Sequence, residues 1–499
     1  MTELIYPTVN LFLYDLRDGL GQNQEIALNC RQFWRKIDPE IDRQIQELVA
    51  VNPDREKVQL VKYEIAYSLD KKLKELGEKE NSEAEFVQLY AKRFDEDEPG
   101  LDGYYFATQL GDTYALQVDS SGTYADYNSK RKNNIEQPIA QLQENKKIII
   151  SHLNHHPNST ELDSDKRGTM GQTWLVWGQL ANNHDALSVA QECYQKLSPN
   201  SSWKLPEFKD PGQLLGANIY EYWHVPTNWG QKWEEFSQEN YHLIICLFPA
   251  SQTPDEIVKN RAEIQKIYFD LTRLLSYRHK VVWAYCQSRY LKAHLKQKSA
   301  EVKLMIDSVK QLPNQIKSQG LDLQELEENL TKALPLLSEY AIQLKSLEIQ
   351  LRTIKSNLGN YKKRLKKLEE KPNTKLDLLE KFAAFAEEKY QEQIESDLAS
   401  LNPDLTLIEN LISTLRGIID IEQTKSDRAL NTTIFIASTG LAASGITATL
   451  VSTQVYSPQN KDNTMTLSSA IWWSIGITFW VIVSAIIFFS IPRFFRPRS

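Results

Sequence analysis

Hydrophobic and polar positions follow one pattern up to about residue 250 and a different pattern beyond it. In the first part, short apolar runs with strand spacing, such as residues 9–16, are mixed with helical stretches such as residues 187–197. Residues 104–110 and 113–119 flank a Gly-Asp pair, which predicts a β-hairpin with a tight turn. Because strands and helices are mixed, residues 1–250 are expected to form one α+β or α/β domain.

Beyond this point Gly and Pro become sparse, and Lys, Glu, Gln and Leu dominate. The pattern predicts one helix over residues 256–312 that ends at Pro313, and a second over residues 321–370. A third helical region follows, and the Asn-Pro-Asp sequence at residues 402–404 is expected to interrupt it and to start a new helix. Residues 251–430 are therefore predicted to form a stalk of long helices.

The second of these helices carries a regular heptad pattern. One row of the repeat comprises Leu330, Leu337, Leu344, Leu351, Leu358 and Leu365, and a row three residues later comprises Ala333, Tyr340, Leu347, Ile354, Tyr361 and Leu368. Apolar positions at this spacing, flanked by Lys and Glu, predict a coiled coil. The partner of this seam is either another chain or a neighbouring helix of the same chain, and the pattern does not choose between them.

Two uncharged segments, residues 432–453 and 469–491, stand near the end of the chain. Each has about 22 residues, enough to cross roughly 30 Å of hydrocarbon. Basic residues flank the pair on both outer sides, whereas the loop between the segments has a single Lys. By the positive-inside rule, residues 431–499 are expected to form a two-pass hairpin in the inner (plasma) membrane, with both chain termini and a basic tail in the cytoplasm.

The first of these segments is rich in small and hydroxyl-bearing residues, whereas the second is bulkier and aromatic. Small residues let helices approach closely, and hydroxyls can line water or bond across helices. Thr433, Gly440, Ser444 and Thr447 are therefore the candidate pore-lining residues. The alternative is a hairpin that packs tightly and conducts nothing.

This order of parts resembles the CorA-like family, in which a cytosolic α/β domain and stalk helices precede two transmembrane segments. The resemblance implies self-association as a homopentamer around a central pore, and a small ligand or divalent cation as the signal. The Gly-Met-Asn motif of that family is absent, and Tyr-Ser-Pro-Gln-Asn stands in its place at residues 456–460. The resemblance therefore covers the architecture and does not extend to magnesium selectivity.

Composition narrows the possible classes of protein. Over 499 residues the mean hydropathy is −0.46, with 25% charged and 41% hydrophobic residues, which excludes both a polytopic transporter and a wholly disordered chain. A net charge of −7 argues against general nucleic-acid binding. Four scattered cysteines without a CxxC pair argue against a disulfide scaffold and against a zinc ribbon.

Motifs for catalysis are missing: no Walker A, GxSxG or HExxH pattern occurs, so no catalytic residue is assigned and the chain is not expected to be an enzyme. His152, His155 and His156 share a helical face and could approach a metal. No nearby cysteine or second paired site supports ligation, so they are interpreted as the end of a surface helix. No metal site is assigned, and the cofactor is unknown.

Aromatic residues are unusually dense between residues 174 and 233, where six tryptophans occur. Such a cluster could stack a base or another planar ligand, although aromatic residues on strands also fill cores. The candidate ligand-binding residues are Trp223, His224, Trp229 and Arg167.

Two hypotheses about function follow from these features. In the first, the chain is a CorA-like channel or membrane effector whose cytosolic sensor domain acts through the stalk on a pore. Some CorA-like proteins are defence effectors switched by nucleotide second messengers, so a nucleotide-gated effector is included. In the second, the chain is a non-conducting membrane anchor whose coiled coil recruits partners.

Overall fold

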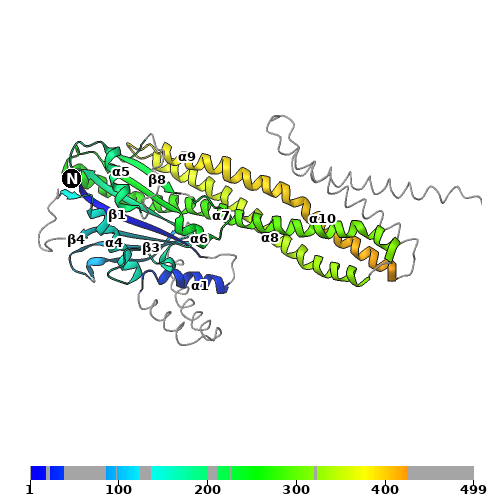
Figure 1. The fold of residues 1–499 in the computed structure, drawn as a ribbon. Coiled ribbons are helices and arrows are strands. Elements are labelled where there is room, and N and C mark those ends of the chain that lie inside the picture. Colours follow the sequence, from blue (N-terminus) through cyan, green and yellow to red (C-terminus); the bar gives the residue numbers. More distant parts are fainter. Residues whose placement is uncertain are drawn as a thin grey trace, which may run out of the picture. The chain divides into compact units, whose positions relative to one another are not determined.

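The computed structural model describes residues 2–17, 23–38, 86–96, 98–123, 136–198, 211–224, 226–319 and 323–423 (Figure 1). The chain divides into two compact units. The first, here called the sheet unit, comprises Met1–Cys286 and Lys355–Glu387. The second, here called the helical unit, comprises Gln287–Ile354 and Glu388–Ser499.

A mixed sheet forms the centre of the sheet unit. Its strands are β1 (Glu3–Leu16), β2 (Phe86–Arg93), β3 (Leu101–Leu110), β4 (Thr113–Thr123), β5 (Glu136–Pro138), β6 (Gly171–Leu180), β7 (Gly212–Leu214), β8 (Ala217–His224) and β9 (Tyr241–Phe248). They run in the order β2-β3-β4-β1-β6-β9-β8-β7, with β5 paired to β1. The β6–β9 pair is parallel and the other pairs are antiparallel, so among the described residues this domain is α+β.

The hairpin expected around residues 111–112 is present as β3 and β4. Gly111 has a φ of +57°, a backbone conformation that favours glycine in a tight turn. The expected strand at residues 9–16 is present as the second half of β1, which begins earlier, at Glu3.

Alternation along β1 separates the two faces of the sheet. Val9, Leu11 and Leu13 face a hydrophobic core shared with α1 (Asn23–Trp34), α4 (Gln141–Asn154) and α5 (Ala186–Leu197). Phe12 and Tyr14 face the other side, where α7 (Pro254–Gln319) begins. The Tyr14 hydroxyl donates to the Thr272 carbonyl at 3.0 Å, and the Phe12 ring contacts Tyr268. Helices therefore cover both faces, and a hydrogen bond and a ring contact hold α7 against one of them.

Three long helices follow the sheet. They are α7, with 66 residues, α8 (Leu323–Glu369), with 47, and α10 (Glu392–Gln423), with 32; the short α9 (Asp377–Phe385) and the π-helical turn η3 (Ala386–Gln391) precede α10. The predicted end at Pro313 and the predicted interruption at residues 402–404 are both wrong, since α7 and α10 continue through these prolines. A proline removes one hydrogen bond of a helix, a loss that many turns of buried packing outweigh.

The heptad seam of α8 is filled from within the chain. All six residues of the second row, from Ala333 to Leu368, are fully buried. In the helical unit the Tyr340 hydroxyl donates to the Leu401 carbonyl of α10 at 2.8 Å, and in the sheet unit the Tyr361 hydroxyl donates to the Leu379 carbonyl of α9 at 3.0 Å. The second row of the seam therefore packs on neighbouring helices of the same chain.

The structure does not support the membrane hairpin that the sequence predicted for residues 431–499. No helix in the described part of the chain is both long enough and apolar enough to cross a bilayer. The long helices α7, α8 and α10 carry charged side chains throughout their length. The segments 432–453 and 469–491, with the pore residues Thr433, Gly440, Ser444 and Thr447, lie outside the described residues. The two-pass inner-membrane arrangement, the channel and the membrane location are thus not supported.

Candidate functional site

A pocket of about 630 Å³ opens on the sheet unit where α4, α5 and the ends of three strands meet. Its walls include Gln143, Lys146, Lys147, Glu161, Arg167, Gln172, Trp174, Lys196, Ser198, His224, Glu239, Asn240 and Tyr241. The side chains come from five separate stretches of the sequence, which the sheet order brings together. We call this cavity the basic pocket.

Positive charge is in excess among these side chains. Lys146, Lys147, Lys196 and Arg167 supply four cations, whereas the carboxylates in the lining are Glu161 and Glu239. Lys147 is half exposed and pairs with Glu144, at 2.8 Å on the same helix. An exposed pair of this kind is weak, so it leaves much of the lysine's charge available to a ligand.

Lys146 is the most firmly held of the four cations. Its ammonium group donates to the Leu197 carbonyl at 2.8 Å and lies 5.3 Å from the centre of the Trp174 ring. The Tyr241 hydroxyl donates to the same carbonyl at 3.0 Å. Burial lowers the pKa of Lys146 to about 8, although nearby Glu161 acts in the opposite direction. The charge of Lys146 is therefore costly to bury, and an anion beside it would stabilise it.

The sequence-predicted ligand residues are only partly brought together. Arg167 and His224 both line the basic pocket. Trp223 lies behind its wall, where the indole N–H donates to the Asn240 side-chain oxygen at 3.0 Å. Trp229 lies outside the pocket and is partly buried, with its ring centre 4.6 Å from that of Phe236 and 4.8 Å from that of Tyr285.

Sequence reasoning missed the lysines of the basic pocket. Lys146 and Lys147 lie on α4 and Lys196 lies at the end of α5, and lysine on the outer face of an amphipathic helix is ordinary. The signal that could have found them is the density of Lys near the ends of two helices that flank strands with Trp. That signal becomes specific only when the strand order is known.

Behind the pocket, a row of buried polar side chains crosses the sheet towards α7. The His242 Nε2 lies 2.9 Å from the Glu221 carboxylate, and its Nδ1 lies 2.7 Å from the Thr173 hydroxyl. The same hydroxyl lies 2.7 Å from His279 Nε2 on α7. A side chain at position 171 would meet the His279 ring, since a Cβ there would lie 2.5 Å from Nδ1, so Gly171 makes this approach possible.

Arg278 completes this row, which we call the buried relay. Its Nε is 3.3 Å from the Glu221 carboxylate, and its guanidinium lies 4.3 Å from the Trp223 ring centre and 4.7 Å from that of Phe382 on α9. Burial raises the pKa of Glu221, against the effect of Arg278, and burial and the Arg278 charge together lower the pKa of His242. The imidazole of His242 is therefore neutral in the folded protein at neutral pH.

The buried relay has the hydroxyl–imidazole–carboxylate order of a nucleophilic triad, but it lacks access. Thr173 is completely buried, and so are His242 and His279. A nucleophile must reach its substrate, so this hydroxyl is not placed for acyl transfer. The relay instead satisfies polar groups inside the sheet unit and ties β6, β8 and β9 to α7.

Two of the three histidines at the end of α4, His152 and His155, have structural partners. The His152 ring stacks on Phe94 with ring centres 3.9 Å apart, and His155 Nε2 lies 2.9 Å from the Arg35 carbonyl. In the residues that the structure describes, no group of three or more His, Cys, Asp or Glu side chains is arranged to hold a metal.

Comparison with known proteins identifies no relative of this chain. No family model matches the chain, and neither a curated protein nor a solved structure matches it. The resemblance to the CorA-like family therefore rests on the sequence features alone, and the function has to be argued from the site.

Proposed function

We propose that the sheet unit is a sensor that binds a phosphate-bearing anion in the basic pocket and passes the binding signal to the long helices. This keeps the sensor half of the first sequence hypothesis and leaves the pore half out. The observation that carries the proposal is the excess of cations around Lys146, whose partly buried ammonium group is held in place by the Leu197 carbonyl. Phosphate is the anion that several converging Lys and Arg side chains commonly recognise.

The size of the pocket and the state of its tryptophan define the ligand further. About 630 Å³ is enough for a nucleotide-sized molecule. Trp174 is almost completely buried, and Lys146 lies over its ring, so this ring offers no open face for stacking a base. The pocket therefore binds the phosphate groups through its cations. A nucleotide with several phosphates fits it better than a nucleoside.

A contact chain links the pocket to the helices. Asn240 lines the pocket and accepts the hydrogen bond of Trp223. The Trp223 ring in turn lies under Arg278 of α7 and meets the Phe382 ring of α9 at 5.5 Å. A ligand that moves Asn240 would therefore shift Trp223 against both helices, and α7 continues from there to Gln319.

Isothermal titration of the full chain with ATP, pyrophosphate and adenosine tests the binding. ATP and pyrophosphate should bind and adenosine should not. Lys146→Met should weaken ATP binding by about tenfold, which corresponds to the loss of one charge-assisted contact. Lys266→Met is the matched control, because Lys266 is an exposed lysine of the same unit that lies outside the basic pocket and pairs with Glu263 on its own helix. Equal binding by wild type and Lys146→Met, or no binding of either phosphate compound, would contradict the proposal.

The pH dependence gives an independent check. Lys146 loses its proton as the pH rises through about 8, so the affinity for pyrophosphate should fall between neutral pH and about pH 9. That decline should be much smaller in Lys146→Met, which has no proton to lose. We propose binding without turnover, so phosphate release from ATP should stay at its rate in the absence of the protein.

A further inference from the structure

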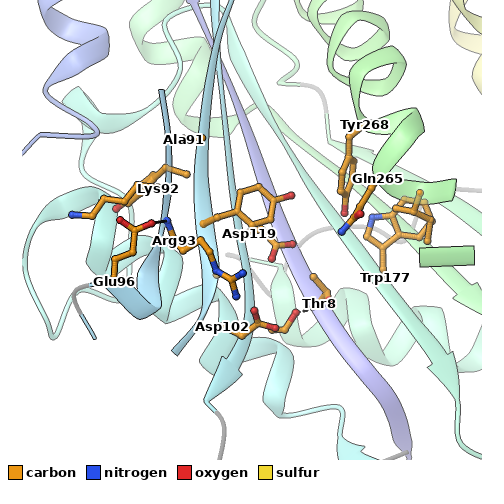
Figure 2. Close-up of a pocket in the computed structure, with 15 residues that line it drawn as sticks. Thr8, Ala91, Lys92, Arg93, Glu96, Asp102, Asp119, Trp177, Gln265 and Tyr268 are labelled. Atoms are coloured by element: carbon orange, nitrogen blue, oxygen red, sulfur yellow. Dashed lines mark hydrogen bonds between the residues drawn. The ribbon is translucent and has the colours of Figure 1, made fainter. Parts of the chain in front are cut away.

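A second cavity of about 550 Å³ lies on the opposite face of the sheet, beside the first turns of α7 (Figure 2). Its walls are Thr8, Ala91, Lys92, Arg93, Glu96, Asp102, Gly103, Tyr104, Tyr105, Asp119, Ser121, Trp177, Ile264, Gln265 and Tyr268. We call it the Asp119 pocket. Its chemistry differs from that of the basic pocket, because carboxylates and aromatic rings lie at its centre.

The inner wall of the Asp119 pocket is acidic and aromatic. Asp119 is 7% exposed and lies opposite Tyr104 in the β3–β4 ladder, with Asp102 two residues from Tyr104 on β3. Burial and the nearby charge of Asp119 both raise the pKa of the Tyr104 hydroxyl, which places a carboxylate charge beside that phenol. Carboxylates set among aromatic rings are the arrangement that recognises organic cations.

The lining contains two cations, Lys92 and Arg93. Arg93 is well exposed and its Nε donates to Asp95, outside the pocket, at 3.1 Å. The Thr8 and Ser121 hydroxyls, 2.8 Å apart, form a neutral pair in the lining. Figure 2 shows Asp119 in the middle of the cavity, between Arg93 on one side and Trp177 and Gln265 on the other. Glu96, Asp102 and Asp119 outnumber the two cations, so the lining carries an excess of negative charge.

Trp177 supplies an independent sign of a ligand. Its side chain is 5% exposed, and its indole N–H is buried without a hydrogen-bond partner among the described residues. The ring is held by stacking on Phe248 and by an edge contact with Tyr268. In Figure 2 the nitrogen-bearing edge of this ring faces the cavity. Buried N–H groups are nearly always paired, so this donor calls for an oxygen acceptor in the cavity.

We propose that the Asp119 pocket binds a small organic amine that also carries an oxygen acceptor. The ammonium group of the ligand pairs with Asp119 and Asp102 among the tyrosine rings, and its oxygen accepts the hydrogen bond of Trp177. An amino sugar has both groups at a suitable size. This site is separate from the basic pocket, since the two share no lining residue.

Titration of the full chain with glucosamine, glucose and putrescine tests the proposal at neutral pH. Glucosamine and glucose differ at one position, where an ammonium group replaces a hydroxyl, and putrescine has two amines and no oxygen. We expect glucosamine to bind at least tenfold more tightly than glucose and several-fold more tightly than putrescine. Binding should persist in Lys146→Met, so failure here and failure of the proposed function are distinguishable.

Two substitutions with matched controls locate the site. Asp119→Asn should weaken glucosamine binding at least tenfold, whereas Asp163→Asn, an exposed aspartate outside the pocket, should leave it unchanged. Trp177→Phe should weaken it about fivefold, the effect of one hydrogen bond. Trp34→Phe is the control, because Trp34 also has a buried and unpartnered N–H but lies outside the pocket. Thermal melting of each variant verifies folding.

Three results would overturn the proposal. Equal affinity for glucose and glucosamine would make this a site for neutral polyols. Unchanged binding in Asp119→Asn would remove the ammonium from the pocket, even if Trp177→Phe failed to fold. Absence of binding by both glucosamine and putrescine at millimolar concentrations would reject an amine site altogether.

Discussion

Each unit of the molecule contains a buried ionic centre, and the two are built differently. In the sheet unit, Glu221 meets one cation, Arg278, and the remaining partners are neutral: His242 and the aromatic rings around the guanidinium. In the helical unit, Asp397 of α10 meets two cations of α7, with Arg289 at 2.5 Å and Lys292 at 2.6 Å.

The difference in surroundings separates two roles for buried charge. The Asp397 centre is a direct clamp between two helices, because cations three residues apart on α7 share one face. The Glu221 centre is part of the buried relay, and its Arg278 contacts the ring of Trp223. The indole N–H of Trp223 donates a hydrogen bond to Asn240, which lines the basic pocket. We infer that the Asp397 centre holds the helices together. The Glu221 centre also transmits the binding signal from the basic pocket to α7.

Removal of Arg278 should have the largest effect on stability. Arg278→Met leaves the Glu221 carboxylate buried without its cation, which should lower the free energy of unfolding by about 4 kcal/mol. Urea unfolding, followed by circular dichroism, measures the loss. The double variant Glu221→Gln/Arg278→Met should be more stable than Arg278→Met alone, because the uncompensated charge is gone. A double variant no better than the single one would show that Arg278 acts through packing on Trp223.

Acid should weaken the sheet unit through its histidines. Burial lowers the pKa of His242 and His279 well below their ordinary value, so both stay neutral in the native state while the unfolded chain takes up protons below about pH 6.5. Stability is therefore lost as the pH falls. Each histidine contributes up to about 2 kcal/mol between neutral pH and about pH 5.

Glu221 opposes this trend, since its raised pKa favours proton uptake by the folded state, but it binds one proton against two. Urea midpoints measured across this pH range should therefore fall on acidification, and the slope should be shallower in His279→Gln. An unchanged slope in that variant would mean that His279 is already protonated in the folded protein.

Substitution of Asp397 in the helical unit should lower the free energy of unfolding less than substitution of Arg278 in the buried relay. Asp397→Asn should cost about 2 kcal/mol, because Arg289 and Lys292 keep some exposure and can turn their charges to water. The same urea experiment measures it, and an exposed acidic residue such as Glu409 on α10, changed to Gln, is the control. If Asp397→Asn were as costly as Arg278→Met, the proposed distinction between the two centres would fail.

The sequence predicted the parts of this molecule whose signal is local. The heptad rows of α8 identified the buried side chains from Ala333 to Leu368, since helical periodicity depends on near neighbours. The β3–β4 hairpin was visible for the same reason. The prolines were misjudged because their cost is local, whereas the packing that outweighs it is not.

The sites were largely beyond sequence reasoning because they depend on strand order. Glu221 and His242 meet because β8 and β9 pair in antiparallel register, and Thr173 joins them because β6 lies on the other side of β9. Lys146 and Arg167 share a pocket through the same arrangement. Arg167 and His224 were named for aromatic neighbours, although the structure places them in a pocket with an excess of cations.

The smallest expected effects come from the two tyrosines of the heptad seam, one in each unit. They test whether the seam is filled from within the chain in both units. Tyr340→Phe and Tyr361→Phe each remove one buried hydroxyl that donates to a backbone carbonyl, at 2.8 Å in the helical unit and at 3.0 Å in the sheet unit. Each change should lower the free energy of unfolding by about 1 kcal/mol, independently of protein concentration. Chemical unfolding at two widely different concentrations measures both quantities. A cost that appears for Tyr361→Phe alone, or one that grows with concentration for Tyr340→Phe, would mean that a second chain fills the seam of the helical unit.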